Sequence, residues 1–324
     1  MNEVEGAVSL GIDIGGTRLR VAAIDPDGRI VSRSSRTTPA TDGEVLVATL
    51  VELLDELPPS PVGIGIAGLV EPDGTVRYGP NIGVRDLPLA KRLRDATGRE
   101  VAVANDASVA ALAEQRIGAG KGARDVILLT LGTGVGGGVV VDGRLVLGTG
   151  GYAGEVGHVI VEEQGRQCPC GNRGCIEAYA SGTAIGLSAR EHLVDPTIET
   201  VLRGRDSLEG TDVTAAAEAG DGFAAEVLEE VGHWLGVAIA SLVNVLDPAV
   251  VLLGGGAAEH VAPWALPPAR SAMARRLVGS AWRQPPQLEV AGLGDDAGVV
   301  GAALLAADRA GVVVAPLDPK LADG

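Results

Sequence analysis

The chain has 324 residues, of which 46% are apolar and 2% aromatic, and its formal net charge is −16. This length exceeds one average domain and predicts two lobes, with enough apolar residues for a sizeable core. An acidic surface with few aromatic side chains repels nucleic acid and anionic membranes, so neither is an expected partner. We expect a small, soluble ligand.

The N-terminus carries no secretory signal pattern, because its first residues are acidic where a signal would be basic and then apolar. The longest apolar stretches, Leu235–Leu246 and Gly298–Ala307, fall short of the ~20 residues that span a membrane. A cytoplasmic location is therefore expected.

The first strand pattern is interrupted by glycine. Leu10–Asp13 alternates as a strand does, the pattern breaks at Gly15–Thr17, and it resumes at Leu19–Ile24. A turn at Asp25–Gly28 returns the chain toward another strand. The segment is predicted to be a hairpin with a glycine-rich break.

Two strands of the buried type follow, Val62–Ala67 and Val101–Ala104. The second leads directly into Asn105 and Asp106, which open a helix predicted to extend to about Gln115. Asn and Asp are both suited to a helix N-cap. From spacing alone, Asp106 is interpreted as a cap.

A second glycine-broken hairpin begins about a hundred residues after the first. The strand Val126–Leu131 leads into Gly132–Gly138, then Val139–Val141, then an Asp-Gly-Arg turn. The similarity to the opening segment suggests two related half-molecules. A third strand, Val250–Leu253, runs into three consecutive glycines.

The glycine turns are candidates for binding a triphosphate. Glycine-rich turns present consecutive backbone N–H groups to an anion, and Thr17 and Thr133 each add a hydroxyl donor. Asp13, just before the first turn, is placed to hold Mg²⁺ directly or through water. The alternative, that the glycines only make tight hairpins, is weakened by the presence of several such turns. The residues of the two turns are Gly15, Gly16, Thr17, Gly132, Thr133 and Gly134.

The three cysteines of the chain lie close together at Cys168, Cys170 and Cys175, with His158 upstream. Three thiolates and one imidazole complete a tetrahedral structural zinc site. An odd cysteine number in a chain expected in the cytoplasm argues against disulfides. The alternative is a loop with three ordinary thiols.

These motifs together resemble the ROK family (repressors, open reading frames and sugar kinases), in particular its bacterial glucokinase branch. The resemblance covers nearly the whole length. Its most distinctive segments are Gly154–His158 and Cys168–Ala178, and Leu10–Thr17 also matches.

The resemblance implies an α/β fold of the two-lobed, actin-like ATPase (ribonuclease H-like) class, with a nucleotide and sugar cleft between the lobes. It predicts a smaller lobe of residues 1–106 plus about 297–312. The larger lobe would be residues 107–296 and would contain the zinc loop 158–175.

The implied activity is transfer of the γ-phosphate of ATP to a hexose, with glucose the first expectation. Asp106 would be the general base, because a sugar hydroxyl is a poor nucleophile until a carboxylate accepts its proton. ATP, Mg²⁺ and a structural Zn²⁺ are the implied cofactors, and a homodimer or homotetramer is the implied assembly. The implied sugar contacts are Gly68, Asn81, Asn105, Asp106, Glu155, His158 and Glu177. The implied adenosine motif is Gly254, Gly255 and Gly256.

Two alternatives stay open at this point. One is another ROK kinase acting on N-acetylmannosamine, N-acetylglucosamine, mannose or fructose, since Ile82–Arg85 departs from the pattern usual in the glucokinases. The other is a sugar-sensing regulator, which is disfavoured because only nine residues precede Leu10, too few for a DNA-binding domain, and because the chain is acidic. The preferred phosphoryl donor, whether ATP, another nucleotide or polyphosphate, is also open.

Overall fold

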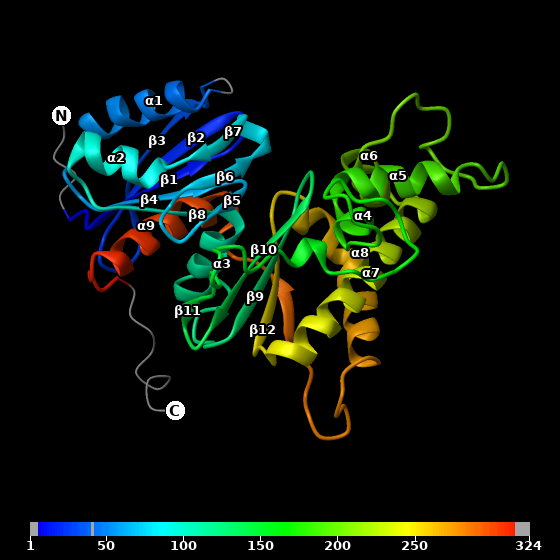
Figure 1. The fold of residues 1–324 in the computed structure, drawn as a ribbon. Coiled ribbons are helices and arrows are strands. Elements are labelled where there is room, and N and C mark those ends of the chain that lie inside the picture. Colours follow the sequence, from blue (N-terminus) through cyan, green and yellow to red (C-terminus); the bar gives the residue numbers. More distant parts are fainter. Residues whose placement is uncertain (1–5, 40–41, 315–324) are drawn as a thin grey trace. The chain divides into compact units, whose positions relative to one another are not determined.

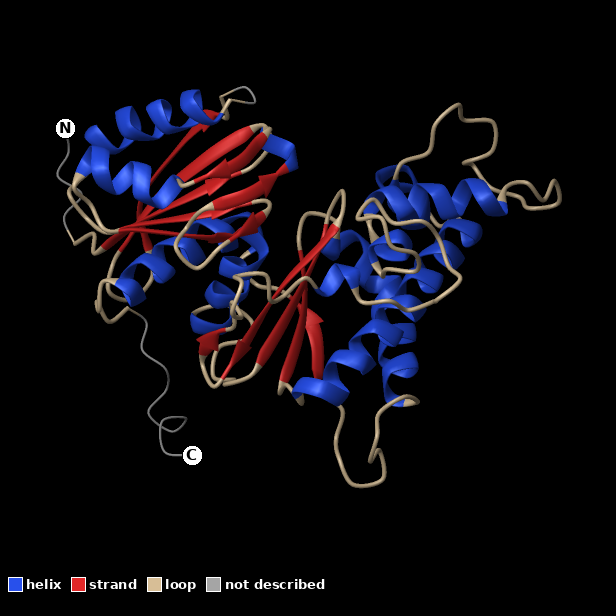
Figure 2. Ribbon diagram, viewed as in Figure 1, coloured by secondary structure: helices blue, strands red, loops and turns tan. Residues whose placement is uncertain are grey.

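The computed structural model describes residues 6–39 and 42–314 (Figure 1). Residue contacts divide the chain into two compact units. Unit 1 comprises Met1–Arg124, Gly138–Gly154 and Asp295–Gly324, and unit 2 comprises Asp125–Gly137 and Glu155–Gly294. Both units combine helices with a β-sheet (Figure 2).

Unit 1 is built on a five-stranded sheet of order β3-β2-β1-β4-β8. The first three strands form an antiparallel meander, and β4 and β8 continue parallel to β1. The strands are β1 (Ser9–Ile14), β2 (Arg18–Ile24), β3 (Ile30–Thr37), β4 (Val62–Ile66) and β8 (Val101–Asn105). Asp13 pairs with Gly65, which pairs with Ala104, so the carboxyl ends of β1, β4 and β8 lie at one edge of the sheet.

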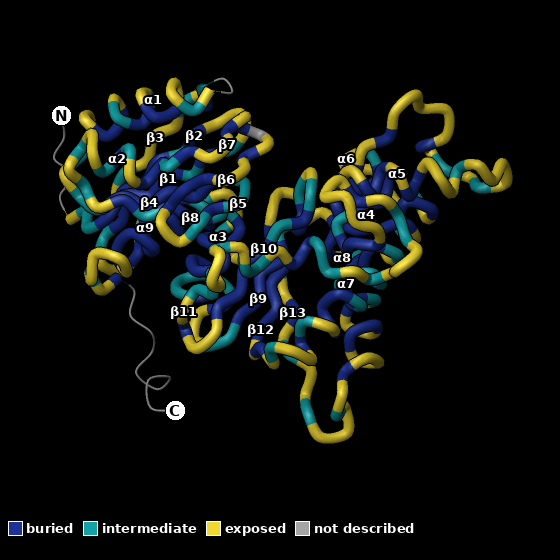
Figure 3. Tube along the Cα trace, viewed as in Figure 1, coloured by how far each residue is buried: buried dark blue, intermediate teal, exposed yellow. Residues whose placement is uncertain are grey.

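The alternation of β1 assigns its side chains to two faces. Leu10, Ile12 and Ile14 are fully buried and belong to the apolar core that includes residues of the two helices on that face. Those helices are α1 (Gly43–Asp55) and α2 (Leu89–Thr97). The other face of β1 carries Asp13 and is covered by α9 (Ala297–Arg309), which also packs on β4. The middle strands β1 and β4 are thus buried between helices, whereas the edge strand β3 is largely exposed (Figure 3).

The helix α3 (Asp106–Arg116) belongs to unit 1 because it packs against α9. The two helices approach so closely that a Cβ on Gly301 would lie 1.8 Å from the carbonyl oxygen of Val109. This division differs from the predicted boundary at residue 106, because residues 107–124 and 138–154 lie in unit 1. The predicted boundary was placed at Asp106, where β8 ends and α3 begins. In the structure α3 stays in unit 1 because it packs against α9.

A small antiparallel sheet of order β5-β6-β7 completes unit 1. Its strands and the short 3₁₀ helix η1 that joins the last two are β5 (Leu69–Val70), β6 (Val76–Gly79), η1 (Pro80–Ile82) and β7 (Val84–Leu87).

The second large sheet has the order β11-β10-β9-β12-β13, and the boundary between the units falls within β10. β12 is parallel to both β9 and β13. The strands are β9 (Val126–Leu131), β10 (Val135–Val141), β11 (Arg144–Leu145), β12 (Val250–Gly254) and β13 (Gln287–Val290).

Unit 2 is rich in helices, and its two longest, α7 and α8, pack against each other. A helix of 25 residues such as α7 is long enough to span a bilayer, yet no helix in the described part of the chain combines that length with sufficient hydropathy. The helical elements are η2 (Val156–His158), α4 (Glu177–Ala180), α5 (Gly182–His192), α6 (Gly210–Glu218), α7 (Gly222–Leu246) and α8 (Ala258–Ala274), with η3 (Gly294–Asp296) before α9.

Candidate active site

The carboxyl edge of the unit 1 sheet brings together several of the predicted residues. Asn105 ends β8 and caps α3, because its Oδ1 accepts a hydrogen bond from the Ser108 N–H at 3.0 Å. Its Nδ2 donates to the carbonyl oxygen of Gly68 at 3.2 Å. Asp106 is the first residue of α3, and its Oδ1 accepts the Ala107 N–H at 2.9 Å. A strand end and a helix start therefore hold both side chains.

Two buried carboxyl groups with raised pKa values, Asp13 and Asp106, belong to this edge. Burial, followed by the negative charges of Asp106 and Asp295, raises the pKa of Asp13 to about 6, although Arg20 opposes the shift. An Arg20 nitrogen lies 3.7 Å from the Asp13 carboxylate and another lies 3.0 Å from that of Asp295. Burial also raises the pKa of Asp106, against the stabilising Ala107 N–H. A cation here would relieve the repulsion between the carboxylates.

The first glycine turn is tightly closed. The Gly15 N–H donates to the Arg18 carbonyl at 3.0 Å, and the Thr38 hydroxyl donates to the Gly15 carbonyl at 2.7 Å. Gly16 and Thr17 are left exposed at the tip. Asn81 lies in η1, and its side chain lies outside the described part of the structure.

Unit 2 contains a cavity of about 580 Å³, a size typical of small-molecule sites. The N-termini of three helices line it: Gly182 and Thr183 begin α5, Gly210 and Thr211 begin α6, and Gly256 and Ala257 precede α8. A helix N-terminus carries a partial positive charge, so the convergence of three such ends favours an anionic ligand. Thr133 of the second glycine turn also lines the cavity.

The three glycines of the predicted adenosine motif, Gly254–Gly256, have different surroundings in the structure. Gly256 lines the cavity, whereas Gly254 and Gly255 are not among its lining residues. Gly255 instead has φ +81°, and a Cβ there would lie 2.5 Å from the Leu131 carbonyl oxygen. Close packing of backbone on β9 explains this glycine without a ligand.

Several residues that line the cavity carry no sequence motif, among them Arg190 and His260. His260 Nδ1 lies 2.8 Å from Glu218 Oε1. For the residues at the start of α5, the sequence does offer one signal: Ser181 is a typical N-cap residue, and its side chain accepts the Ala184 N–H. The segments lining the cavity are far apart along the chain, and only tertiary structure brings them together. The missed lining residues are Gly182, Thr183, Ile185, Arg190, Ser207, Leu208, Glu209, Gly210, Thr211, Thr214, Ala257 and His260.

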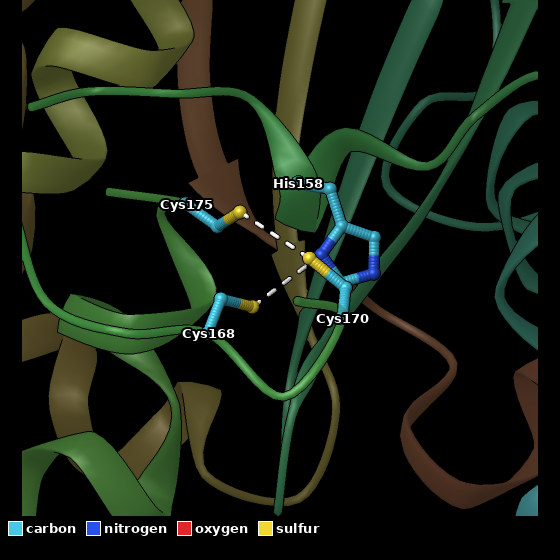
Figure 4. A group of neighbouring side chains, drawn as sticks. All are labelled: His158, Cys168, Cys170 and Cys175. Carbon is cyan, nitrogen blue, oxygen red and sulfur yellow. Dashed lines mark hydrogen bonds between the residues drawn. The ribbon is translucent and has the colours of Figure 1, made fainter. Parts of the chain in front are cut away.

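The cysteines and histidine of the predicted metal site point toward one another (Figure 4). Cys168 Sγ lies 3.8 Å from His158 Nδ1, and Cys170 Sγ lies 3.6 Å from Cys175 Sγ. The four potential ligand atoms lie within 4.8 Å of one another. Ligands of a tetrahedral zinc site with Zn–S bonds of about 2.3 Å are separated by about 3.8 Å. The donor set and its spacing therefore fit Zn²⁺.

The two ring nitrogens of His158 face different groups. Nδ1 faces Cys168, whereas Nε2 lies 3.8 Å from Glu155 Oε2. Glu177, the first residue of α4, also borders the cluster, since its Oε1 is 3.5 Å from Cys168 Sγ. The structure thus gathers Glu155, His158 and Glu177 around the cysteine loop.

The chain is similar in sequence to known sugar kinases of one family. Residues 9–309 match the ROK family. The chain is 37% identical to a glucokinase of Halalkalibacterium halodurans over 318 residues, which cover 90% of this chain and 92% of that protein. It is 35% identical to an N-acetylmannosamine kinase of Citrobacter koseri, over 92% of this chain and 98% of the relative.

The fold is also that of a solved structure, a ROK family glucokinase from Streptomyces griseus in complex with glucose and AMPPNP. The TM-score is 0.78 at 38% sequence identity, and the match covers 93% of this chain and 99% of the other. The predicted α/β fold of the actin-like ATPase class is confirmed by this similarity. The chain is therefore a member of the ROK family.

Proposed function

We propose that this protein is an ATP-dependent glucokinase, which converts glucose and ATP to glucose 6-phosphate and ADP. The observation that carries the proposal is Asp106, a half-buried carboxylate held at the start of α3 beside Asn105 and Asp13. The similarity of nearly the whole chain to a solved glucokinase in complex with glucose and AMPPNP supports this choice of substrates.

Asp106 is assigned as the general base. Its Oδ1 accepts the Ala107 N–H, which leaves Oδ2 to accept the proton of a sugar hydroxyl. A raised pKa makes the carboxylate a stronger proton acceptor near neutral pH. As the proton leaves, the sugar oxygen bonds to the γ-phosphorus, and the bond from that phosphorus to the leaving oxygen of ADP breaks.

The donor nucleotide is assigned to the cavity of unit 2, with its phosphates near the second glycine turn, whose Gly132 and Thr133 line that cavity. The partial positive charge of three helix N-termini and the Thr133 turn, which line this cavity, favour the binding of phosphate oxygens. Asp13 is assigned to Mg²⁺, directly or through water, since this ion prefers carboxylate and phosphate oxygens. When bound, the ion neutralises phosphate charge.

The cysteine loop is assigned to a structural zinc ion with His158, Cys168, Cys170 and Cys175 as ligands. Nε2 of His158 remains free of the cluster and faces the side of Glu155. We therefore assign zinc an ordering role: it fixes the loop that carries the sugar-binding side chains. The proposed sugar contacts remain those that the family resemblance implies, namely Gly68, Asn81, Asn105, Asp106, Glu155, His158 and Glu177.

A second candidate is an N-acetylmannosamine kinase, favoured by the similarity to the enzyme of C. koseri. The departure at Ile82–Arg85, after the predicted sugar contact Asn81, bears on this choice. Gly83 there has φ +64° and ends η1, so this loop has its own defined conformation. Acceptor choice between these sugars is the property that this loop is most expected to affect.

The test is a coupled ADP-release assay on purified, zinc-replete protein with ATP and a panel of sugars. The panel is glucose, mannose, fructose, N-acetylglucosamine and N-acetylmannosamine. We expect the highest kcat/KM with glucose. Turnover of an N-acetyl sugar without turnover of glucose would replace the first assignment by the second.

Two further assignments accompany the activity. We propose a cytoplasmic enzyme and a homodimer or homotetramer, both from its family. Sedimentation of the purified protein determines the oligomeric state. Replacing ATP by polyphosphate or other nucleotides in the same assay determines the preferred donor.

A further inference from the structure

Glu177 lies where the cysteine loop, the helix α4 and the second glycine turn meet, all within unit 2. Its Oε2 accepts a hydrogen bond from the Val135 N–H at 3.0 Å, and its Oε1 faces the Cys168 thiol at 3.5 Å. A Cβ on Gly134 would lie 2.5 Å from Oε2. The carboxylate is therefore packed directly onto the turn that precedes β10.

The segment after Glu177 holds the same turn at two more points. The Gly182 N–H donates to the Gly132 carbonyl at 2.7 Å, and the Thr183 hydroxyl donates to the Thr133 carbonyl at 3.2 Å. A glycine-rich turn has many accessible backbone conformations and loses much entropy when it is ordered. Such external hydrogen bonds select one conformation before a ligand arrives.

We infer that Glu177 is a positioning residue for the phosphate turn Gly132–Val135, in addition to its proposed contact with the sugar. The inference rests on the proposed function. A negative carboxylate repels a polyphosphate, so any benefit to nucleotide binding comes from the geometry that Glu177 gives the turn and not from its charge. The Glu177 side chain then both orders the turn that binds the nucleotide phosphates and contacts the sugar.

Two substitutions of Glu177 are expected to affect nucleotide binding differently. Glu177→Gln keeps an oxygen that can accept the Val135 N–H and removes the charge, so the turn stays ordered and the repulsion disappears. Glu177→Ala removes the acceptor and leaves the Val135 N–H without its partner. A lost hydrogen bond to a charged group corresponds to about a tenfold change in an equilibrium constant.

The experiment is calorimetric titration of the full-length, zinc-replete protein with Mg²⁺ and AMPPNP in the absence of sugar. We expect the Kd of Glu177→Ala to rise about tenfold, and that of Glu177→Gln to equal or fall below the wild-type value. Both variants are expected to bind glucose more weakly. Unchanged AMPPNP affinity in both variants, or an equal loss in both, overturns the inference.

A second measurement reports on the order of the turn Gly132–Val135 in the absence of any ligand. Hydrogen exchange of the Val135 amide is expected to be about tenfold faster in Glu177→Ala than in the wild type, and unchanged in Glu177→Gln. Equal exchange in all three proteins contradicts the inference even if Glu177→Ala is destabilised. A wild-type protein that binds no AMPPNP contradicts the proposed function instead, so the two failures are distinguishable.

Discussion

The raised pKa of Asp13 predicts that removing its charge stabilises the protein. The ordinary pKa of this carboxyl is 3.8, and the folded value is about 6, chiefly because of burial. At 1.36 kcal/mol for each tenfold change in proton affinity, this difference corresponds to about 3 kcal/mol. Ionised Asp13 therefore lowers the stability of the folded chain by about that amount at pH 7.

The dependence on pH has a defined sign. The folded carboxyl binds its proton more tightly than the unfolded one, so stability falls as the pH rises from about 4 to about 6. Below this window both states are protonated and the penalty is absent. Asp13→Asn resembles the protonated acid at every pH and is expected to avoid the penalty.

The assay is urea denaturation followed by far-UV circular dichroism, at pH 7 and at about pH 4. We expect Asp13→Asn to raise the free energy of unfolding by about 3 kcal/mol at pH 7, and by less than about 1 kcal/mol at the lower pH. Asp27→Asn, at an exposed turn of the same unit, is the matched control and should change neither value. No stabilisation at pH 7, or the same stabilisation at both pH values, refutes the reasoning. Activity should fall, because Asp13 is the proposed Mg²⁺ ligand.

Three further substitutions test separate parts of the account. Cys170→Ser should lower the zinc content of the purified protein and raise the KM for glucose at least tenfold; unchanged metal stoichiometry argues against the zinc site. Gly134→Val places a Cβ 2.5 Å from Glu177 Oε2, so the KM for ATP should rise about tenfold, and an effect limited to glucose argues against the assignment of the turn. Gly301→Val, whose Cβ meets a backbone oxygen at 1.8 Å, should destabilise unit 1 by about 3 kcal/mol or more; an unchanged urea midpoint contradicts the described packing of α9 on α3.

The helix cap at Asn105 and the cysteine loop were predictable from the sequence, because the residues that indicate each of them are neighbours along the chain. Asn105 follows a buried strand and caps the next helix, as its residue type indicates. The cysteine loop carries three ligand-type residues within eight positions, and the structure brings His158 to them. In these cases the groups lie near one another along the chain, so the sequence already indicates that they belong together.

Features that depend on tertiary packing were not predictable in the same way. The membership of α3 in unit 1 depends on its packing against α9, almost two hundred residues later. The cavity of unit 2 is lined by the starts of α5, α6 and α8, and none of these starts carries a phosphate motif by itself. The contact of Glu177 with the Val135 N–H joins residues 42 positions apart. In each case a backbone group is the partner, and residue type does not reveal it.

Asp106→Asn tests the central claim most directly, because it removes the proposed base while preserving the shape of the side chain. Glucose and AMPPNP affinities are measured by calorimetry, and turnover is measured by single-turnover phosphoryl transfer from ATP. We expect the rate of transfer to fall by about 10²–10⁴-fold with glucose affinity within about threefold of the wild type. Phosphoryl transfer at a near-normal rate would contradict the assignment of Asp106 as the base.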